Sequence, residues 1–175
     1  MGTRFEFSTF TSAEAARVSG VNGTQQRNLR RHGYLPEQGK GWTRYSIQDV
    51  ARLIVVGKLS ELGVTPAVST KVADKKWRRT AQSAATIICA FAANDRDAIL
   101  EDVPNKFDED PIKTGPLGLP RFLVIRPGRE CDFARQAPTF TEDGEGALTV
   151  MDLQGLARLL VKRAEKPLVT VKADT

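Results

Sequence analysis

The chain has 175 residues, of which 41% are hydrophobic and 27% are charged, and its formal net charge is +5. This composition is typical of a globular protein and not of a disordered one, and no apolar run approaches the roughly 20 residues that cross a bilayer. Two cysteines are too few for a disulfide framework, and the first residues lack the apolar core of a signal peptide, so we expect a cytoplasmic protein.

Charge is distributed unevenly along the chain. Residues 1–80 hold 14 Lys and Arg against 6 Asp and Glu, a balance of +8, whereas residues 81–175 hold 12 against 15, a balance of −3. A basic half suits a polyanion such as nucleic acid, but an ordinary soluble surface would give the same totals. Charge alone therefore leaves both interpretations open.

Two short helices are predicted near the start of the chain. Thr11 and Glu14 have the spacing of a capping box, which predicts that a helix begins at the next residue after the threonine, and Gly20 is expected to end it. A second helix, from about Thr24 to His32, is almost entirely polar. An ordinary surface helix is the alternative, but its Gln, Asn and Arg side chains are the types that reach base edges and phosphates, and they favour a DNA-binding helix.

A basic segment spaced by glycines follows the second helix. Trp42 and Tyr45 favour a strand, so the sequence predicts a tight two-stranded ribbon, or wing, over residues 40–45. Ser46 and Asp49 then occupy the positions of a helix cap and of an acid in the first helical turn. They predict a third helix that packs against the first two.

A seam of apolar residues with heptad-like spacing begins at Trp77. The steps between its members are four, three, four and three residues, and the members are Trp77, Ala81, Ala84, Ile88 and Phe91. Its small alanines would let two helices approach closely, so homodimerisation through this helix is the preferred prediction. The alternative is that the seam packs on the chain's own C-terminal part.

The rest of the chain predicts a small unit of strands and one helix. Residues 94–120 are rich in Asp, Pro and Gly, which favours a loop or linker. Strands are predicted over residues 122–125, 131–135, 148–151 and 168–171. Asp152 is expected to cap a helix that Pro167 ends.

These elements together predict an α+β protein in three parts. Residues 1–75 would form a winged helix-turn-helix domain, and residues 76–95 a linking dimerisation helix. Residues 96–175 would form a small α+β domain that serves assembly or binds an effector or partner.

An ordered set of short motifs connects the first part to a known family. The set comprises Gly20-Val21, Gly33-Tyr34-Leu35-Pro36, Gly41 to Ser46, Asp49-Val50 and Leu59 to Val64. With this order and spacing, residues 12–75 resemble the DNA-binding domain of the MerR family of bacterial regulators. The resemblance covers somewhat more than a third of the chain, and the remainder does not resemble a MerR effector domain.

The resemblance also has departures. Arg27 occupies the place of the family's recognition-helix arginine, whereas Asn28 and Leu29 stand where the family usually has two tyrosines. In the wing, Trp42 replaces a tyrosine and Thr43 stands where the family's arginine would be. Arg44 comes one place later, so the resemblance leaves the wing's phosphate contact to Arg44 or Lys40.

What the resemblance implies is a DNA-binding head without a MerR-type sensor. We therefore expect a sequence-specific transcriptional regulator of a bacterium or phage, associated with the nucleoid, that binds double-stranded DNA as a homodimer on two half-sites. RNA polymerase or another regulator is a further candidate partner. The candidate DNA contacts are Thr24, Gln25, Gln26, Arg27, Asn28, Arg30 and Arg31 in the helix and Lys40, Trp42, Thr43, Arg44 and Tyr45 in the wing.

Two other function classes stay open. One is a DNA-architectural or recombination accessory factor, excisionase-like or packaging-like, and the other is an adaptor whose head binds protein. No enzyme is expected, because the sequence contains no defensible set of nucleophile, base and orienting residue. His32 is the single histidine, and Cys89 and Cys131 are far apart in sequence, so neither a metal site nor a cofactor is expected.

Overall fold

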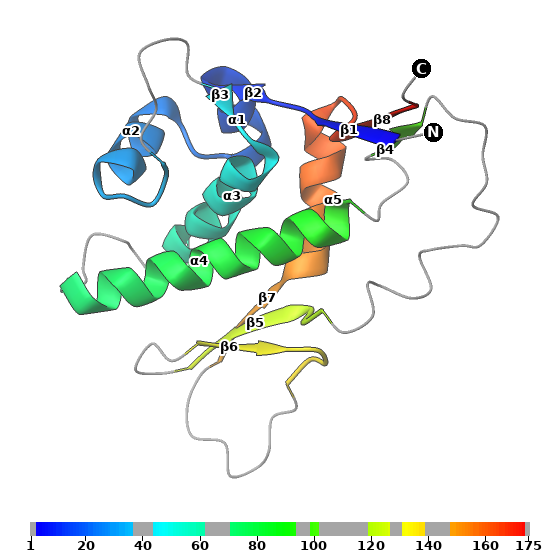
Figure 1. Cartoon of the computed structure of the whole chain (residues 1–175). Helices are drawn as coiled ribbons and strands as arrows, with labels where there is room; N and C mark the ends of the chain where they lie inside the picture. Colours follow the sequence, from blue (N-terminus) through cyan, green and yellow to red (C-terminus); the bar gives the residue numbers. More distant parts are fainter. Residues whose placement is uncertain are drawn as a thin grey trace.

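The computed structural model describes residues 3–36, 44–61, 71–93, 99–101, 119–126, 131–138 and 148–173. They form a mixed structure of helices and small sheets, which agrees with the predicted α+β class (Figure 1). In chain order the elements are β1 (Thr3–Phe7), β2 (Phe10–Thr11), α1 (Ser12–Ser19), α2 (Gly23–Arg31), β3 (Arg44–Tyr45), α3 (Ile47–Glu61), α4 (Lys71–Ala92), β4 (Ile99–Glu101), β5 (Phe122–Ile125), β6 (Cys131–Ala134), β7 (Thr149–Asp152), α5 (Leu153–Ala164) and β8 (Val169–Ala173).

Local capping signals fix the ends of α1 as the sequence predicts. Thr11 Oγ1 accepts a hydrogen bond from the backbone N–H of Glu14, and the Glu14 carboxylate accepts one from the backbone N–H of Thr11 at 2.6 Å. Gly20 ends the helix with a φ of 78°, in the left-handed region that a residue with a side chain adopts only with strain. The start of α1 is therefore bonded in both directions.

The start of α3 follows the same rule. Ser46 Oγ accepts from the backbone N–H of Asp49, and the Asp49 carboxylate accepts from both the N–H and the hydroxyl of Ser46. The cap predicted from these two residues is confirmed, and α3 begins at the next residue.

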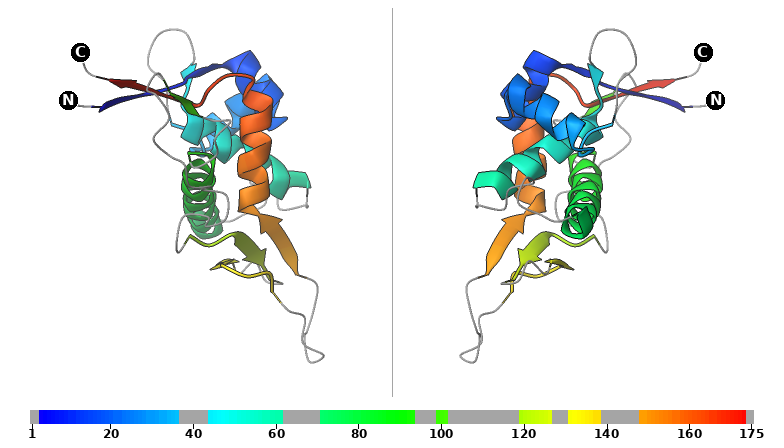
Figure 2. Two further views of the ribbon diagram at one scale, coloured as in Figure 1. Left: turned by 90° about the vertical axis from the view of Figure 1, so that its right-hand side faces the viewer. Right: turned by 90° about the vertical axis from the view of Figure 1, so that its left-hand side faces the viewer.

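Helix α4 separates two groups of elements. Figure 1 shows α1, α2 and α3 on one side of α4, and the sheet of β6, β5 and β7 on the other. Helix α5 runs from β7 past α4 and reaches the sheet of β1, β8 and β4, as the views in Figure 2 also show. We call residues 10–36 and 44–61, which contain β2, α1, α2, β3 and α3, the head.

The C-terminal segment contacts the head and the N-terminal strand directly. Strand β8 pairs antiparallel with β1 and parallel with β4. Arg163 donates to the carbonyl oxygen of Val18 in α1 at 3.2 Å, and Ser8 donates to the carbonyl oxygen of Pro167 at 2.6 Å. The two ends of the sequence therefore stabilise each other.

A single hydrophobic core extends through the whole described structure. It runs from Phe10 in the head to Val169 in β8 and includes residues of α3, α4 and α5. This core crosses both of the predicted boundaries, at residues 75 and 95, so residues of all three predicted parts pack together.

The predicted dimer seam lies inside this core. Ala81, Ala84, Ile88 and Phe91 are buried within the single chain, and α4 packs against α3 and α5. The side chain of Trp77 lies outside the described residues. The heptad-like spacing is therefore explained by packing within the chain, which was the alternative, and these four side chains offer no surface to a second copy.

One ion pair between the C-terminal segment and the head has a pH dependence that can be measured. Lys166 Nζ lies 2.8 Å from the carboxylate of Glu14, and this bond, with that from the Thr11 N–H, lowers the pKa of Glu14 from 4.5 to about 2. The charged form thus stabilises the fold above pH 4.5, and this contribution is lost as the pH falls from 4.5 towards 2.

We expect Glu14→Gln to lower the free energy of unfolding by about 1 kcal/mol at pH 7, a modest value because a third of this side chain is exposed. The difference from the unmodified protein should shrink as urea denaturation is repeated at lower pH. Glu61→Gln, which breaks the more exposed pair with Lys58, is the control and should cost about 0.5 kcal/mol or less. A loss of equal size at every pH would contradict the role given to the Glu14 carboxylate.

Candidate nucleic-acid interface

Helix α2 presents a polar outer ridge to solvent. Thr24, Arg27, Asn28 and Arg31 are all exposed, and their spacing of three, one and three residues places them on one side of the helix. The opposite side holds Leu29, which is buried in the core. This outer ridge brings together four of the predicted DNA-contacting residues.

Gln26 lies inside the protein, although it was predicted to contact DNA. Its side chain is 1% exposed. Its Oε1 accepts from the Ser12 hydroxyl at 2.7 Å, and its Nε2 donates to the carbonyl oxygens of Ser12 and Val21. Burial therefore excludes Gln26 from contact with a duplex, because the amide is used to join α1, the turn and α2.

Replacing Gln26 with alanine should lower the free energy of unfolding by about 1–3 kcal/mol, because the buried hydroxyl and carbonyl partners would lose their hydrogen bonds. Urea denaturation monitored by circular dichroism measures this loss. Asn28→Ala, at an exposed position of the same helix, is the matched control and should change stability by about 0.5 kcal/mol or less. Equal and small effects of both substitutions would contradict a structural role for Gln26.

Gln25 is exposed but has a local partner. Its side-chain oxygen accepts from the backbone N–H of Asn22 at 2.9 Å, while the Asn22 side chain accepts from the backbone N–H of Gln25. The two residues thus form the capping box that starts α2. The Asn-x-x-Gln spacing was a readable signal for this cap, which the sequence analysis missed.

Tyr45 is a second predicted contact that the structure buries. It is 2% exposed, and its hydroxyl oxygen accepts from Arg30 Nη2 at 2.6 Å. The guanidinium of Arg30 also lies 5.4 Å from the centre of the Tyr45 ring, within the range of a cation–π interaction. Tyr45 therefore orients an arginine and does not itself offer a surface to DNA.

A pocket with a volume of about 470 Å³ opens beside these residues at the start of α2. We call it the arginine pocket. Two of its lining residues are arginines, and no acidic residue occurs among those that the structure describes there. The lining residues are Ser12, Asn22, Gly23, Thr24, Arg27, Arg30 and Tyr45.

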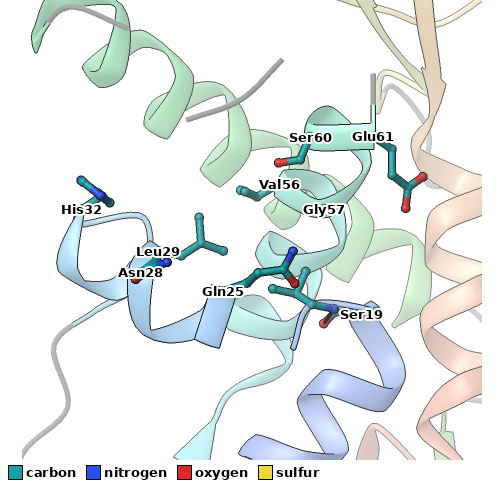
Figure 3. A pocket seen from close by; sticks show the side chains of 11 residues that line it. Ser19, Gln25, Asn28, Leu29, His32, Val56, Gly57, Ser60 and Glu61 are labelled. Atoms are coloured by element: carbon teal, nitrogen blue, oxygen red, sulfur yellow. Dashed lines mark hydrogen bonds between the residues drawn. The ribbon is translucent and has the colours of Figure 1, made fainter. Parts of the chain in front are cut away.

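A second pocket, of about 480 Å³, lies on the other side of α2, between this helix and α3. Figure 3 shows Leu29 pointing toward Val56, with His32 and Glu61 at opposite ends of the pocket. Gly57 packs closely there, because a Cβ atom at this position would lie 3.0 Å from the Val21 side chain, which would have to shift by a few tenths of an ångström. The glycine thus lets α3 approach the turn that joins α1 to α2.

The segment predicted to form the wing lies only partly within the described residues. Arg44 is exposed and lies in β3, where it pairs with Thr11 of β2. Lys40, Trp42 and Thr43 lie outside the described residues. Before the undescribed residues 37–43, the chain is bonded to α3, because Arg52 donates to the backbone carbonyl oxygen of Tyr34 at 3.1 Å.

Cys89 and His32, the other residues considered for a site, contribute to the packing and to the end of a helix. Cys89 packs against the core, and burial, with a smaller effect of Asp49, raises the pKa of its thiol to about 12. His32 caps the end of α2 through its backbone N–H. Within the described part of the chain, His, Cys, Asp and Glu side chains form no group of three or more that could hold a metal ion. No helix in the described ranges has the length and apolar character that crossing a bilayer requires.

Comparison of the chain with protein-family models, with curated proteins and with solved structures found no match. The outer ridge and the arginine pocket are therefore interpreted from their own chemistry.

Proposed function

We propose that this protein binds double-stranded DNA through α2, with the head acting as a winged helix-turn-helix of the MerR type. The observation that carries the proposal is the exposed outer ridge of Thr24, Arg27, Asn28 and Arg31. Beside it lies the arginine pocket, which has no carboxylate among its described lining residues. Arginine binds phosphates and guanine edges, and asparagine binds adenine edges, so these side chains suit the major groove.

The head offers the duplex a second basic element. Arg44 is exposed at the end of the wing segment, and β3 is held to α2 by the bond from Arg30 to Tyr45. An arginine at this place would contact the phosphate backbone of the DNA next to the groove that α2 enters. Base reading would fall chiefly to Asn28, because the side-chain oxygen of Gln25 caps its own helix. The arginines of α2 would mainly contact phosphates.

The proposal extends to a transcriptional regulator that acts as a homodimer on two half-sites, since one small head buries too little surface to select a single genomic site. The contact between the two copies would lie outside the buried seam of α4. Sedimentation of the protein at tens of micromolar, with and without a two-site duplex, tests this part separately.

The deciding experiment is the selection of bound fragments from the genome that encodes the protein, followed by affinity measurements on a selected duplex. If about six phosphates are engaged, the affinity should fall by roughly a thousandfold between 50 and 200 mM salt. Sites at promoters would support a regulator, and sites clustered at an attachment or packaging sequence would support an accessory factor. Absence of duplex binding at 50 mM salt would refute the proposal.

A further inference from the structure

The arginine pocket combines positive charge with donors that are held in place. Arg27 and Arg30 approach it from the same helix, one turn apart, and Arg27 Nη2 donates to Thr24 Oγ1 at 3.2 Å. This bond leaves the hydroxyl hydrogen of Thr24 available to a third group. A pocket with two cations and a hydroxyl donor, and with no carboxylate among its described lining residues, favours an anion.

Arg30 is fixed but incompletely satisfied. Its guanidinium has five N–H donors, and among the described residues its hydrogen bond is the one to Tyr45. Its Nε is buried and has no hydrogen-bond partner in the described structure. Because Nε itself is buried, an anion in the pocket would bond Arg30 through the other N–H groups of the guanidinium, and it would also compensate the positive charge of this partly buried group.

The start of α2 adds to this field. The pocket is lined by Asn22, Gly23 and Thr24, which are the cap and the first two residues of a nine-residue helix. The capping box already satisfies the backbone N–H groups of Asn22 and Gln25. The helix start therefore offers an anion the N–H groups of Gly23 and Thr24, together with the helix dipole, which favours negative charge there. The arginines, the hydroxyl and the helix start therefore converge on one space.

We propose that the arginine pocket holds one phosphate of the DNA backbone, gripped by Arg27 and Arg30 and by the start of α2. This inference rests on the proposed function and adds a defined anchor to it. A phosphodiester has two non-bridging oxygens that share one negative charge, and their spacing matches the fork of a guanidinium. Because the pocket adjoins the outer ridge, a phosphate held there fixes the depth and register of the ridge in the groove.

The test neutralises one phosphate at a time. A selected duplex is prepared in a series, each member carrying one methylphosphonate, which removes the charge of a single phosphate. The affinity of each duplex is measured for the unmodified protein and for Arg30→Gln and Arg27→Gln. Arg31→Gln is the matched control, because Arg31 lies on the same helix and carries the same charge but does not line the pocket.

The expected result is one position in each half-site where the methylphosphonate weakens binding of the unmodified protein and of Arg31→Gln by about tenfold or more. At that position the two pocket variants should lose about threefold or less, because their contact is already missing. If all four proteins lose the same factor at every position, the pocket holds no phosphate and the inference is overturned. Arg27 is exposed, so its variant keeps the test valid even if Arg30→Gln proves unstable.

Inorganic phosphate separates the two possible sources of the anion. If the unmodified protein binds no duplex, the proposed function and this inference both fail. Thermal stabilisation by phosphate that is lost in Arg27→Gln and Arg30→Gln but kept in Arg31→Gln would then assign the pocket to a free anion. A different outcome is that the protein binds the duplex while each methylphosphonate weakens binding of all four proteins by the same factor. That result refutes the phosphate site in the pocket and leaves the proposed function standing.

Discussion

Replacing Ile88 with alanine is expected to lower the free energy of unfolding by about 2–5 kcal/mol. Ile88 is 0% exposed and lies in the core that α4 shares with α3 and α5. The loss combines the transfer free energy of the removed carbons with the cavity that they leave. Because a domain's total stability is about 5–15 kcal/mol, this is among the largest effects available to a single substitution.

Urea denaturation and thermal melting measure the effect of the Ile88 substitution. Ser83→Ala, at an exposed position of the same helix, is the control and should change stability by about 0.5 kcal/mol or less. The association state of the folded Ile88→Ala protein should equal that of the unmodified protein. A variant of unchanged stability that converted a dimer to a monomer would restore the seam as an interface between copies.

The second large effect concerns the outer ridge. We expect Arg27→Ala/Arg31→Ala to weaken duplex binding by about a hundredfold at 100 mM salt, since charge-assisted contacts contribute about 1.5–3 kcal/mol each. The slope of log affinity against log salt should become shallower by about two units, one for each lost phosphate contact. Fluorescence anisotropy on a labelled duplex over a salt series gives both quantities.

The control for this comparison must lose the same net charge as Arg27→Ala/Arg31→Ala. Arg135→Ala/Arg158→Ala removes two exposed arginines outside the head, one directly after β6 and one in α5, so it changes the total charge equally. This control should weaken binding by about threefold or less, because neither arginine lies on the outer ridge and salt screens exposed charges that make no direct contact. Equal losses in the two double variants would indicate attraction by net charge and not a contact through α2.

Features that depend on neighbouring residues could be predicted from the sequence. The capping box at Thr11, the turn at Gly20 and the caps at Ser46 and Asp152 all appear in the structure at the predicted positions. Each of them is decided within about four residues by a few hydrogen bonds. The strands at 122–125 and 131–134 also form and pair as expected.

Features that depend on distant residues could not be predicted. Gln25 and Gln26 are the same residue type, and one caps a helix while the other is buried, because only the packing of α1 decides which side of α2 faces inward. The spacing of Ala84 and Ile88 indicates a covered face but cannot identify what covers it. The arginine pocket depends on Tyr45 meeting Arg30 across 15 residues, and no motif encodes this contact.

The antiparallel pairing of β1 with β8 has a consequence for synthesis and folding. The register joins Thr3 to Ala173 and Phe7 to Val169. Strand β1 therefore cannot pair with β8 until residues 169–173 have been translated. Closing so long a loop costs chain entropy before any contact compensates for it, which slows formation of the pair. During that interval the nascent chain exposes an open strand edge, a known template for intermolecular pairing.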